Sequence, residues 1–81
     1  MPYIRKKTRK ALIKGSIIPM NAGELNFLFS TTALSYLLKH GTTYQNINDI
    51  IGALEGCKLE LYARVARPYE DIKIKENGDI Y

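Results

Sequence analysis

One apolar stripe along residues 46–67 constrains the fold of this chain more than any other feature. Apart from one adjacent pair, its members lie three or four residues apart: Ile47, Ile50, Ile51, Leu54, Cys57, Leu61 and Val65. This spacing is typical of one face of an α-helix and lacks the alternation of a β-strand. Asn46 can cap the first turn, and Pro68 predicts an end at Arg67. The stripe therefore predicts an amphipathic helix over residues 46–67.

A second helix is predicted over residues 21–40. Asn21 and Glu24, three residues apart, form a capping-box arrangement, and Gly41 is placed to end the helix. The main apolar stripe comprises Leu25, Leu28, Phe29, Thr32, Tyr36 and Leu37, and it is widened by Phe27, Leu34 and Leu38. A helix that is apolar over more than one face generally packs against two partners.

The short connection at residues 41–43 predicts that these two helices are antiparallel neighbours. We therefore expect an all-α fold, an antiparallel helical hairpin of about residues 21–40 and 46–67. We expect the chain to divide into two parts: a basic leader with a loop over residues 1–20, and a helical hairpin domain with a C-terminal tail over residues 21–81. The tail fits a short helix ending near Asn77 or a β-hairpin at Asn77–Gly78. The helix is favoured because an isolated two-stranded hairpin is marginal in water.

Basic residues are concentrated in the leader. The chain carries +4, but its first twenty residues carry +6, which leaves six basic against eight acidic residues for the rest. The leader's cations are Arg5, Lys6, Lys7, Arg9, Lys10 and Lys14. Residues 3–14 predict a short, weakly amphipathic helix, followed by a loop over 15–20. The leader could bind nucleic-acid phosphates, lie on an anionic membrane surface, or act as a solvated arm that keeps the protein soluble.

The chain is small for a self-sufficient domain, so we expect a homo-oligomer. Its 81 residues include one cysteine, Cys57, so no internal disulfide can form. We expect the Cys57 side chain to be buried as a small apolar group. Gly52 and Gly56 lie inside the predicted helix at a cost of about 1 kcal/mol each, which a close helix approach would explain. With Leu54 and Leu61 they form the candidate oligomer interface. The approaching helix is either 21–40 or the same helix of another subunit.

A second candidate anion site lies at the end of the 46–67 helix. Arginine beside an aromatic ring suits nucleotide recognition, and the residues concerned are Tyr62, Arg64, Arg67 and Tyr69. The alternative is structural: Arg64 follows Glu60 by four residues, which favours a surface ion pair, and both arginines complement a helix C-terminus.

The sequence offers no catalytic or metal-binding constellation. One histidine and one cysteine do not make a usual zinc site, and His40 is placed to act as a cation at a helix C-terminus. No phosphate-binding glycine loop is present, and no serine has a paired base at a recognisable spacing. We therefore expect no enzyme, metal or cofactor. No apolar run approaches the length of a membrane span, and a reduced cysteine suits the cytoplasm.

Four stretches carry a family resemblance: Gly23–Asn26 (GELN), Tyr44–Glu55 (YQNINDIIGALE), Lys58–Tyr62 (KLELY), and Pro68–Asp71 (PYED) running to Lys75–Tyr81 (KENGDIY). Through them, residues 21–81 resemble a family of small uncharacterised proteins of bacteria and their phages, described only as a domain of unknown function. The first twenty residues match this family poorly. The resemblance implies a phage or mobile-element origin and a bacterial host cytoplasm, but no activity.

A shorter likeness concerns Leu61–Pro68 (LYARVARP). It is similar to the closing helix of phage proteins that sequester the cyclic nucleotide signals of bacterial immunity. Those proteins are small helical hairpins that assemble into oligomers and hold ligands between subunits. The likeness implies a joint role for the candidate nucleotide-binding residues.

Three functions are therefore expected in competition. The first is a non-catalytic accessory protein that binds a phosphate-bearing partner, most generally nucleic acid, through the leader. The second is an anti-defence protein that sequesters a cyclic nucleotide between subunits. The third is an inhibitory or structural protein that binds a host protein through its apolar helix faces.

Overall fold

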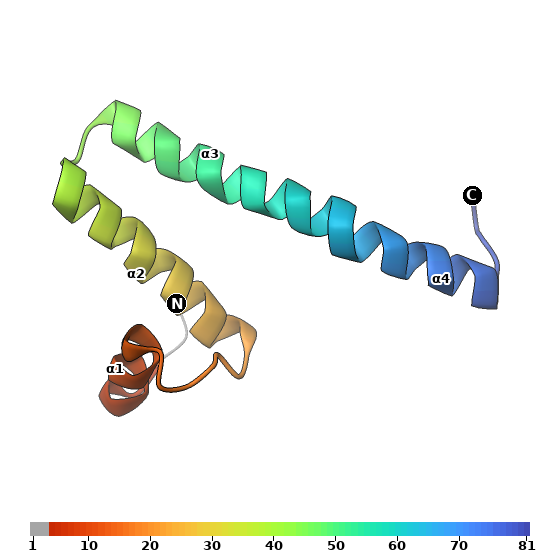
Figure 1. The fold of residues 1–81 in the computed structure, drawn as a ribbon, viewed down its shortest axis with the longest axis horizontal. Coiled ribbons are helices and arrows are strands. Elements are labelled where there is room, and N and C mark those ends of the chain that lie inside the picture. The colour runs from red at the N-terminus through yellow and green to blue at the C-terminus, as the bar shows by residue number, and fades with distance from the viewer. Residues whose placement is uncertain (1–3) are drawn as a thin grey trace. The chain divides into compact units, whose positions relative to one another are not determined.

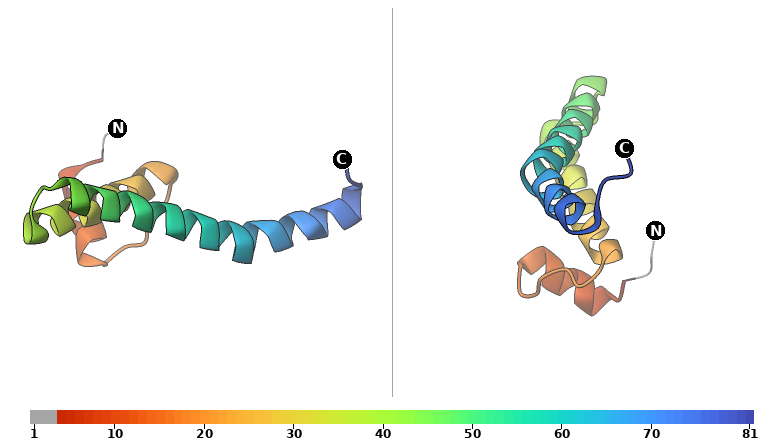
Figure 2. Two further views of the ribbon diagram at one scale, coloured as in Figure 1. Left: turned by 90° about the horizontal axis from the view of Figure 1, so that it is seen from above. Right: turned by 90° about the vertical axis from the view of Figure 1, so that its right-hand side faces the viewer.

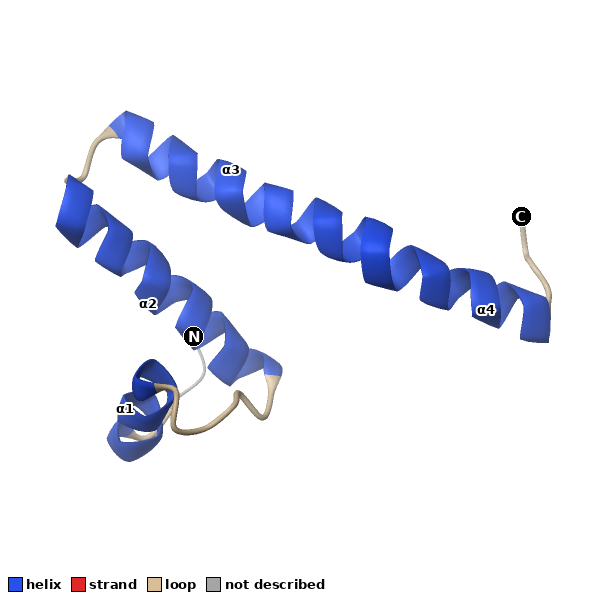
Figure 3. Ribbon diagram, in the orientation of Figure 1, coloured by secondary structure: helices blue, strands red, loops and turns tan. Residues whose placement is uncertain are grey.

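The structure is a computed structural model of the chain and describes residues 4–81, which contain helices, turns and loops and no strand (Figures 1 and 3). The predicted all-α class is confirmed. In chain order the elements are α1 (Lys6–Lys14), α2 (Ala22–His40), α3 (Tyr44–Leu61), the π-helical turn η1 (Tyr62–Ala66) and α4 (Arg67–Asn77). The chain divides into two compact units, Met1–Asn46 and Ile47–Tyr81.

Helix α1 confirms the short helix predicted in the leader, although Tyr3, the predicted first residue, lies outside the described residues. The helix ends at Gly15, whose left-handed backbone (φ 80°) suits a residue without a Cβ. The Gly15 N–H donates to the Leu12 carbonyl (3.1 Å), and the Ser16 N–H donates to the Ala11 carbonyl (2.9 Å). This pair of bonds is a Schellman motif, which satisfies the last carbonyls of the helix.

Helix α2 has the predicted ends. The Asn21 side chain accepts a hydrogen bond from the Glu24 N–H (2.9 Å), and the Glu24 carboxylate accepts one from the Met20 N–H (3.0 Å). Two backbone donors at the helix start are therefore satisfied by side chains. At the other end Gly41 has a positive φ of 102°, and its N–H donates to the Leu37 carbonyl at 2.7 Å.

The first two helices pack as a hairpin, with α1 beside α2 (Figure 2). The buried side chains among the described residues are Leu12 of α1, 3% exposed, and Phe27 of α2, 8% exposed. Phe27 belongs to the residues that only widen the predicted main stripe of α2, so the face that meets α1 differs from the one the stripe indicates. The antiparallel pairing of residues 21–40 with 46–67 stays a prediction.

Helix α3 begins at Tyr44, two residues before the predicted start, because the N-cap is Thr43 rather than Asn46. The Thr43 hydroxyl accepts a hydrogen bond from the Asn46 N–H at 3.1 Å. The Asn46 side-chain amide instead donates to two carbonyls at the end of α2, those of His40 (3.2 Å) and Gly41 (2.8 Å). Asn46 therefore links the first turn of α3 to the last residues of α2.

Pro68 does not end the helix at Arg67, and this prediction is wrong. The chain continues helically from α3 through η1 into α4, which ends at Asn77 (Figure 1). In an uninterrupted α-helix, the proline ring would clash with the Arg64 carbonyl four residues back. In η1 the Arg67 N–H donates to the Tyr62 carbonyl, five residues back, and this wider turn places Pro68 in the first turn of α4, where proline is tolerated.

The tail is helical, as favoured over the β-hairpin. Helix α4 ends at Asn77, and Gly78 follows with a φ of 84° and an N–H that donates to the Ile74 carbonyl at 2.7 Å. Within the unit Ile47–Tyr81 no side chain is buried, and no second helix of this unit packs on the apolar stripe. Cys57 is therefore exposed, which corrects the prediction of a buried residue.

Candidate anion-binding groove

Helix α1 gathers part of its positive charge on one face. Lys6, Arg9, Lys10 and Ile13 follow one another at steps of three, one and three residues, which places them on the same side of an α-helix. Helix α1 has no acidic residue in its first turn. Because acids are also absent from the rest of the leader, this face carries uncompensated positive charge.

Against α2 this face forms an open groove of about 390 Å³. Its walls are Lys6, Arg9, Lys10 and Ile13 from α1 and Phe27 and Thr31 from α2. The Thr31 hydroxyl donates to the Leu28 carbonyl of its own helix (3.2 Å), so the α2 side of the groove is largely apolar. The lining of the groove is almost entirely apolar, so its three basic residues contribute mainly their aliphatic stems to it, and no carboxylate is among the lining residues.

The groove separates the six predicted phosphate-binding residues into two sets of three. Lys6, Arg9 and Lys10 line it, whereas Arg5, Lys7 and Lys14 do not. Arg5 has an extended backbone and stands at the N-cap position of α1, and Lys14 is the last residue of the helix. The sequence did not identify Ile13, Phe27 and Thr31 as groove residues, because two of them come from a helix whose packing against α1 the pattern does not reveal.

The four candidate nucleotide-binding residues lie where η1 meets α4: Tyr62 and Arg64 belong to η1, and Arg67 and Tyr69 belong to α4. Arg64 is paired with the Glu60 carboxylate, as the alternative interpretation expected. The Tyr62 hydroxyl donates to a Glu70 carboxylate oxygen at 3.1 Å, and Lys73 lies over the Tyr69 ring, 5.6 Å from its centroid. Two of the four residues are therefore engaged with carboxylates, which oppose an anionic ligand. Their joint role stays a prediction.

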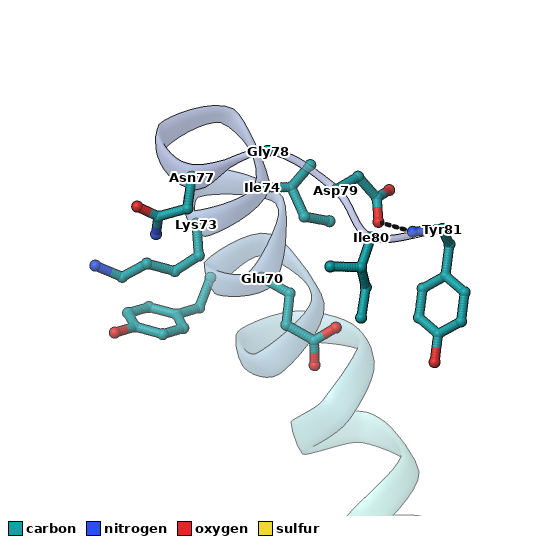
Figure 4. Close-up of a pocket in the computed structure, with 9 residues that line it drawn as sticks. Glu70, Lys73, Ile74, Asn77, Gly78, Asp79, Ile80 and Tyr81 are labelled. Atoms are coloured by element: carbon teal, nitrogen blue, oxygen red, sulfur yellow. Dashed lines mark hydrogen bonds between the residues drawn. The ribbon is translucent and has the colours of Figure 1, made fainter.

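Tyr69 instead contributes to a shallow pocket of about 380 Å³ at the C-terminal end of α4. Residues 78–81 turn back beside the last turns of the helix, so that Ile80 lies next to Ile74 (Figure 4). The Tyr81 N–H donates to the Asp79 carboxylate at 2.9 Å. Neither arginine of the predicted nucleotide site lines this pocket.

The four candidate interface residues lie on two sides of α3. Residues two apart in an α-helix are separated by about 200° around the axis, so Gly52 and Gly56 lie roughly opposite Leu54. Leu61, seven residues after Leu54, lies on the same side as Leu54. Apart from adjacent residues and the backbone of its own helix, a Cβ added to Gly52 or Gly56 would meet no atom within 4 Å. The close helix approach at the glycines stays a prediction.

His40, the last residue of α2, stacks at a tilt on Tyr36 with 4.5 Å between ring centroids. Residues 4–81 contain no group of three or more His, Cys, Asp and Glu side chains that could hold a metal ion. In the same part of the chain, no helix has both the length and the apolar character needed to cross a membrane.

The fold and the groove define a class: a small all-α protein whose cationic first helix packs against an apolar second helix. The family model for DUF6899, a domain of unknown function, matches residues 1–80, and the chain belongs to this family. The match includes the leader, so the expectation that the first twenty residues fit the family poorly is wrong. Comparisons with curated proteins and with solved structures gave no match.

Proposed function

We propose that this protein is a non-catalytic accessory protein, of the phage or mobile-element type, that binds a phosphate-bearing partner through the groove between α1 and α2. Nucleic acid is the most general partner of this kind. The observation that carries the proposal is the set of three cations around an apolar floor, with no carboxylate among the lining residues. Lysine and arginine neutralise phosphates, and an apolar floor accepts the face of a base or the edge of a sugar.

The groove supports binding over a merely solubilising leader. A solvated arm needs charge but no fixed arrangement, whereas Leu12 anchors α1 and sets the cationic face against Phe27 and Thr31. A lysine or arginine held on a packed helix has less conformational freedom to lose on binding than one in a free chain. The proposal therefore assigns binding to three specific cations rather than to the charge of the leader as a whole.

Two triple variants test this assignment with identical changes in charge and composition. The groove variant is Lys6→Glu with Arg9→Glu and Lys10→Glu, and its matched control is Arg5→Glu with Lys7→Glu and Lys14→Glu. Each removes two lysines and one arginine. Fluorescence anisotropy with a labelled single-stranded and a labelled duplex oligonucleotide, measured between 50 and 200 mM salt, should show binding that weakens steeply with salt for the natural sequence.

The groove variant should lose binding and, where residual binding is measurable, reduce the salt slope of log K by about three. The control should retain most of the affinity at the highest salt, where long-range attraction is screened. Equal losses in both variants would contradict a specific groove. A third arm uses vesicles with and without anionic lipid: binding to anionic vesicles and not to oligonucleotides would assign the face to a membrane surface instead.

A further inference from the structure

A regular alternation of steps runs along one face of α3. From Ile47 the apolar residues follow at steps of three, four, three and four: Ile50, Leu54, Cys57 and Leu61. This is the heptad spacing of helices that pack side by side with interlocking side chains. In an uninterrupted helix the next three positions would be Arg64, Pro68 and Asp71, and the apolar face would end at Leu61.

The wide turn η1 shifts these positions by one residue. A π-helical turn contains one residue more than an α-helical turn, and the i to i−5 bond from Arg67 to Tyr62 marks the extra residue. The positions that continue the face therefore become Val65, Tyr69 and Ile72, which are all apolar or aromatic and all exposed. We call the face from Ile47 to Ile72, with these eight side chains, the seam.

We propose that the seam is the surface through which this chain pairs with the seam of a second copy. Within the unit Ile47–Tyr81 nothing is buried, and an isolated helix that contains two glycines is not stable in water. Six of the eight seam side chains are exposed and the other two, Ile47 and Ile50, are partly exposed, so the seam leaves an apolar face on the order of several hundred Å² uncovered on each copy. An exposed apolar face of this size on a small protein marks an interaction surface, and it approaches the roughly 800 Å² that each partner contributes to a stable, specific interface.

A second copy meets the requirement of the seam without further assumption. It carries the same heptad steps over the same length, and it is present at the same concentration as the first. A packed pair of this kind would bury Cys57 as well as the leucines, and a free cysteine is among the residues most often found buried. The inference concerns the α3–α4 face alone, so it does not rest on the groove between α1 and α2.

The test is the mass of the full chain in solution, measured by size-exclusion chromatography with light scattering. The natural sequence should elute at twice 9.2 kDa or a higher multiple. Leu61→Lys places a charge in the seam, and Leu59→Lys is its matched control. The two leucines are 60% and 59% exposed and lie about 200° apart around the helix. Leu61→Lys should raise the dissociation constant about 100-fold, and Leu59→Lys by less than about threefold.

The natural sequence decides the outcome even if Leu61→Lys loses its helix, which circular dichroism would reveal. A folded particle of 9.2 kDa at every concentration up to the millimolar range would overturn the seam. An equal loss of assembly in Leu59→Lys would also overturn it, because the contact would then not follow this face. Since no ligand is present, neither result bears on the groove.

Discussion

At the scale of single residues, Phe27 shows where sequence periodicity stops being informative. The apolar residues of α2 cover more than one face, so the spacing predicts a helix without saying which face meets α1. The main stripe indicates a face through Leu28 and Thr32, but the side chain buried in the structure is Phe27. The choice depends on α1, whose Leu12 is the other buried residue, and this pairing is a tertiary fact that no local pattern contains.

Burial of Phe27 makes a direct prediction. Phe27→Ala removes a buried aromatic ring from a very small core and should lower the free energy of unfolding by about 3 kcal/mol. Phe29→Ala, in the same helix but 47% exposed, should cost less than about 1 kcal/mol. Urea titration followed by circular dichroism measures both. Similar costs for the two variants would show that α1 does not pack on Phe27.

For the cations of the leader, too, the sequence predicts one part of the groove and only the structure shows the other. Their number and position were evident from the sequence, and the helical steps from Lys6 to Ile13 already place four residues on one face. The other side of the groove, Phe27 and Thr31, comes from α2 and follows only from the packing of the two helices. The sequence therefore predicts a basic leader, and the structure shows which three of its six cations line the groove.

At the scale of elements, η1 is the main departure from sequence-based expectation. Proline after a helical pattern usually marks a helix end, because it lacks an N–H and clashes with the preceding turn. Here one wide turn relieves the clash, and the helix continues for ten more residues to Asn77. The sequence contains an indication of the wide turn, because the spacing of the apolar residues changes after Leu61. Val65, Tyr69 and Ile72 follow at steps of four, four and three. Read as a continuous face, those steps require one extra residue within residues 62–66.

Deletions test whether η1 keeps the seam continuous. Removing Ala63, together with Pro68→Ala, should convert η1 into regular α-helix and restore unbroken heptads, so that self-association is retained and the melting temperature rises. Removing Gly52 instead deletes one residue from a regular stretch and turns Ile47 and Ile50 about 100° away from the rest of the seam.

Light scattering and thermal melting of the two deletion variants give the comparison. The Gly52 deletion should weaken assembly at least about tenfold, although loss of a helical glycine alone would favour the helix. If both deletions weaken assembly equally, η1 has no role in aligning the seam. If neither does, the seam itself is not the contact.

At the scale of the whole molecule, the sequence predicted the helical class and most helix boundaries, because caps, glycines and periodicity are local. The sequence did not predict how few side chains are buried within one chain. Two side chains in the described residues are buried, and the apolar side chains of α3 and α4 are largely exposed. A chain with so small a core lacks the burial that offsets conformational entropy, so its folding should be coupled to assembly.

Coupling of this kind makes thermal stability depend on protein concentration. If two copies dissociate as they unfold, a tenfold increase in concentration adds about 0.7 kcal/mol per chain, which raises the melting temperature by roughly 3–6 °C for a domain of this size. Circular dichroism melts from about 1 to 100 μM would measure the trend, and Leu61→Lys should melt lower, with a weaker dependence on concentration. A melting temperature for the natural sequence that stays constant over this range would mean that each chain is stable alone, and the exposed seam would then have no part in folding.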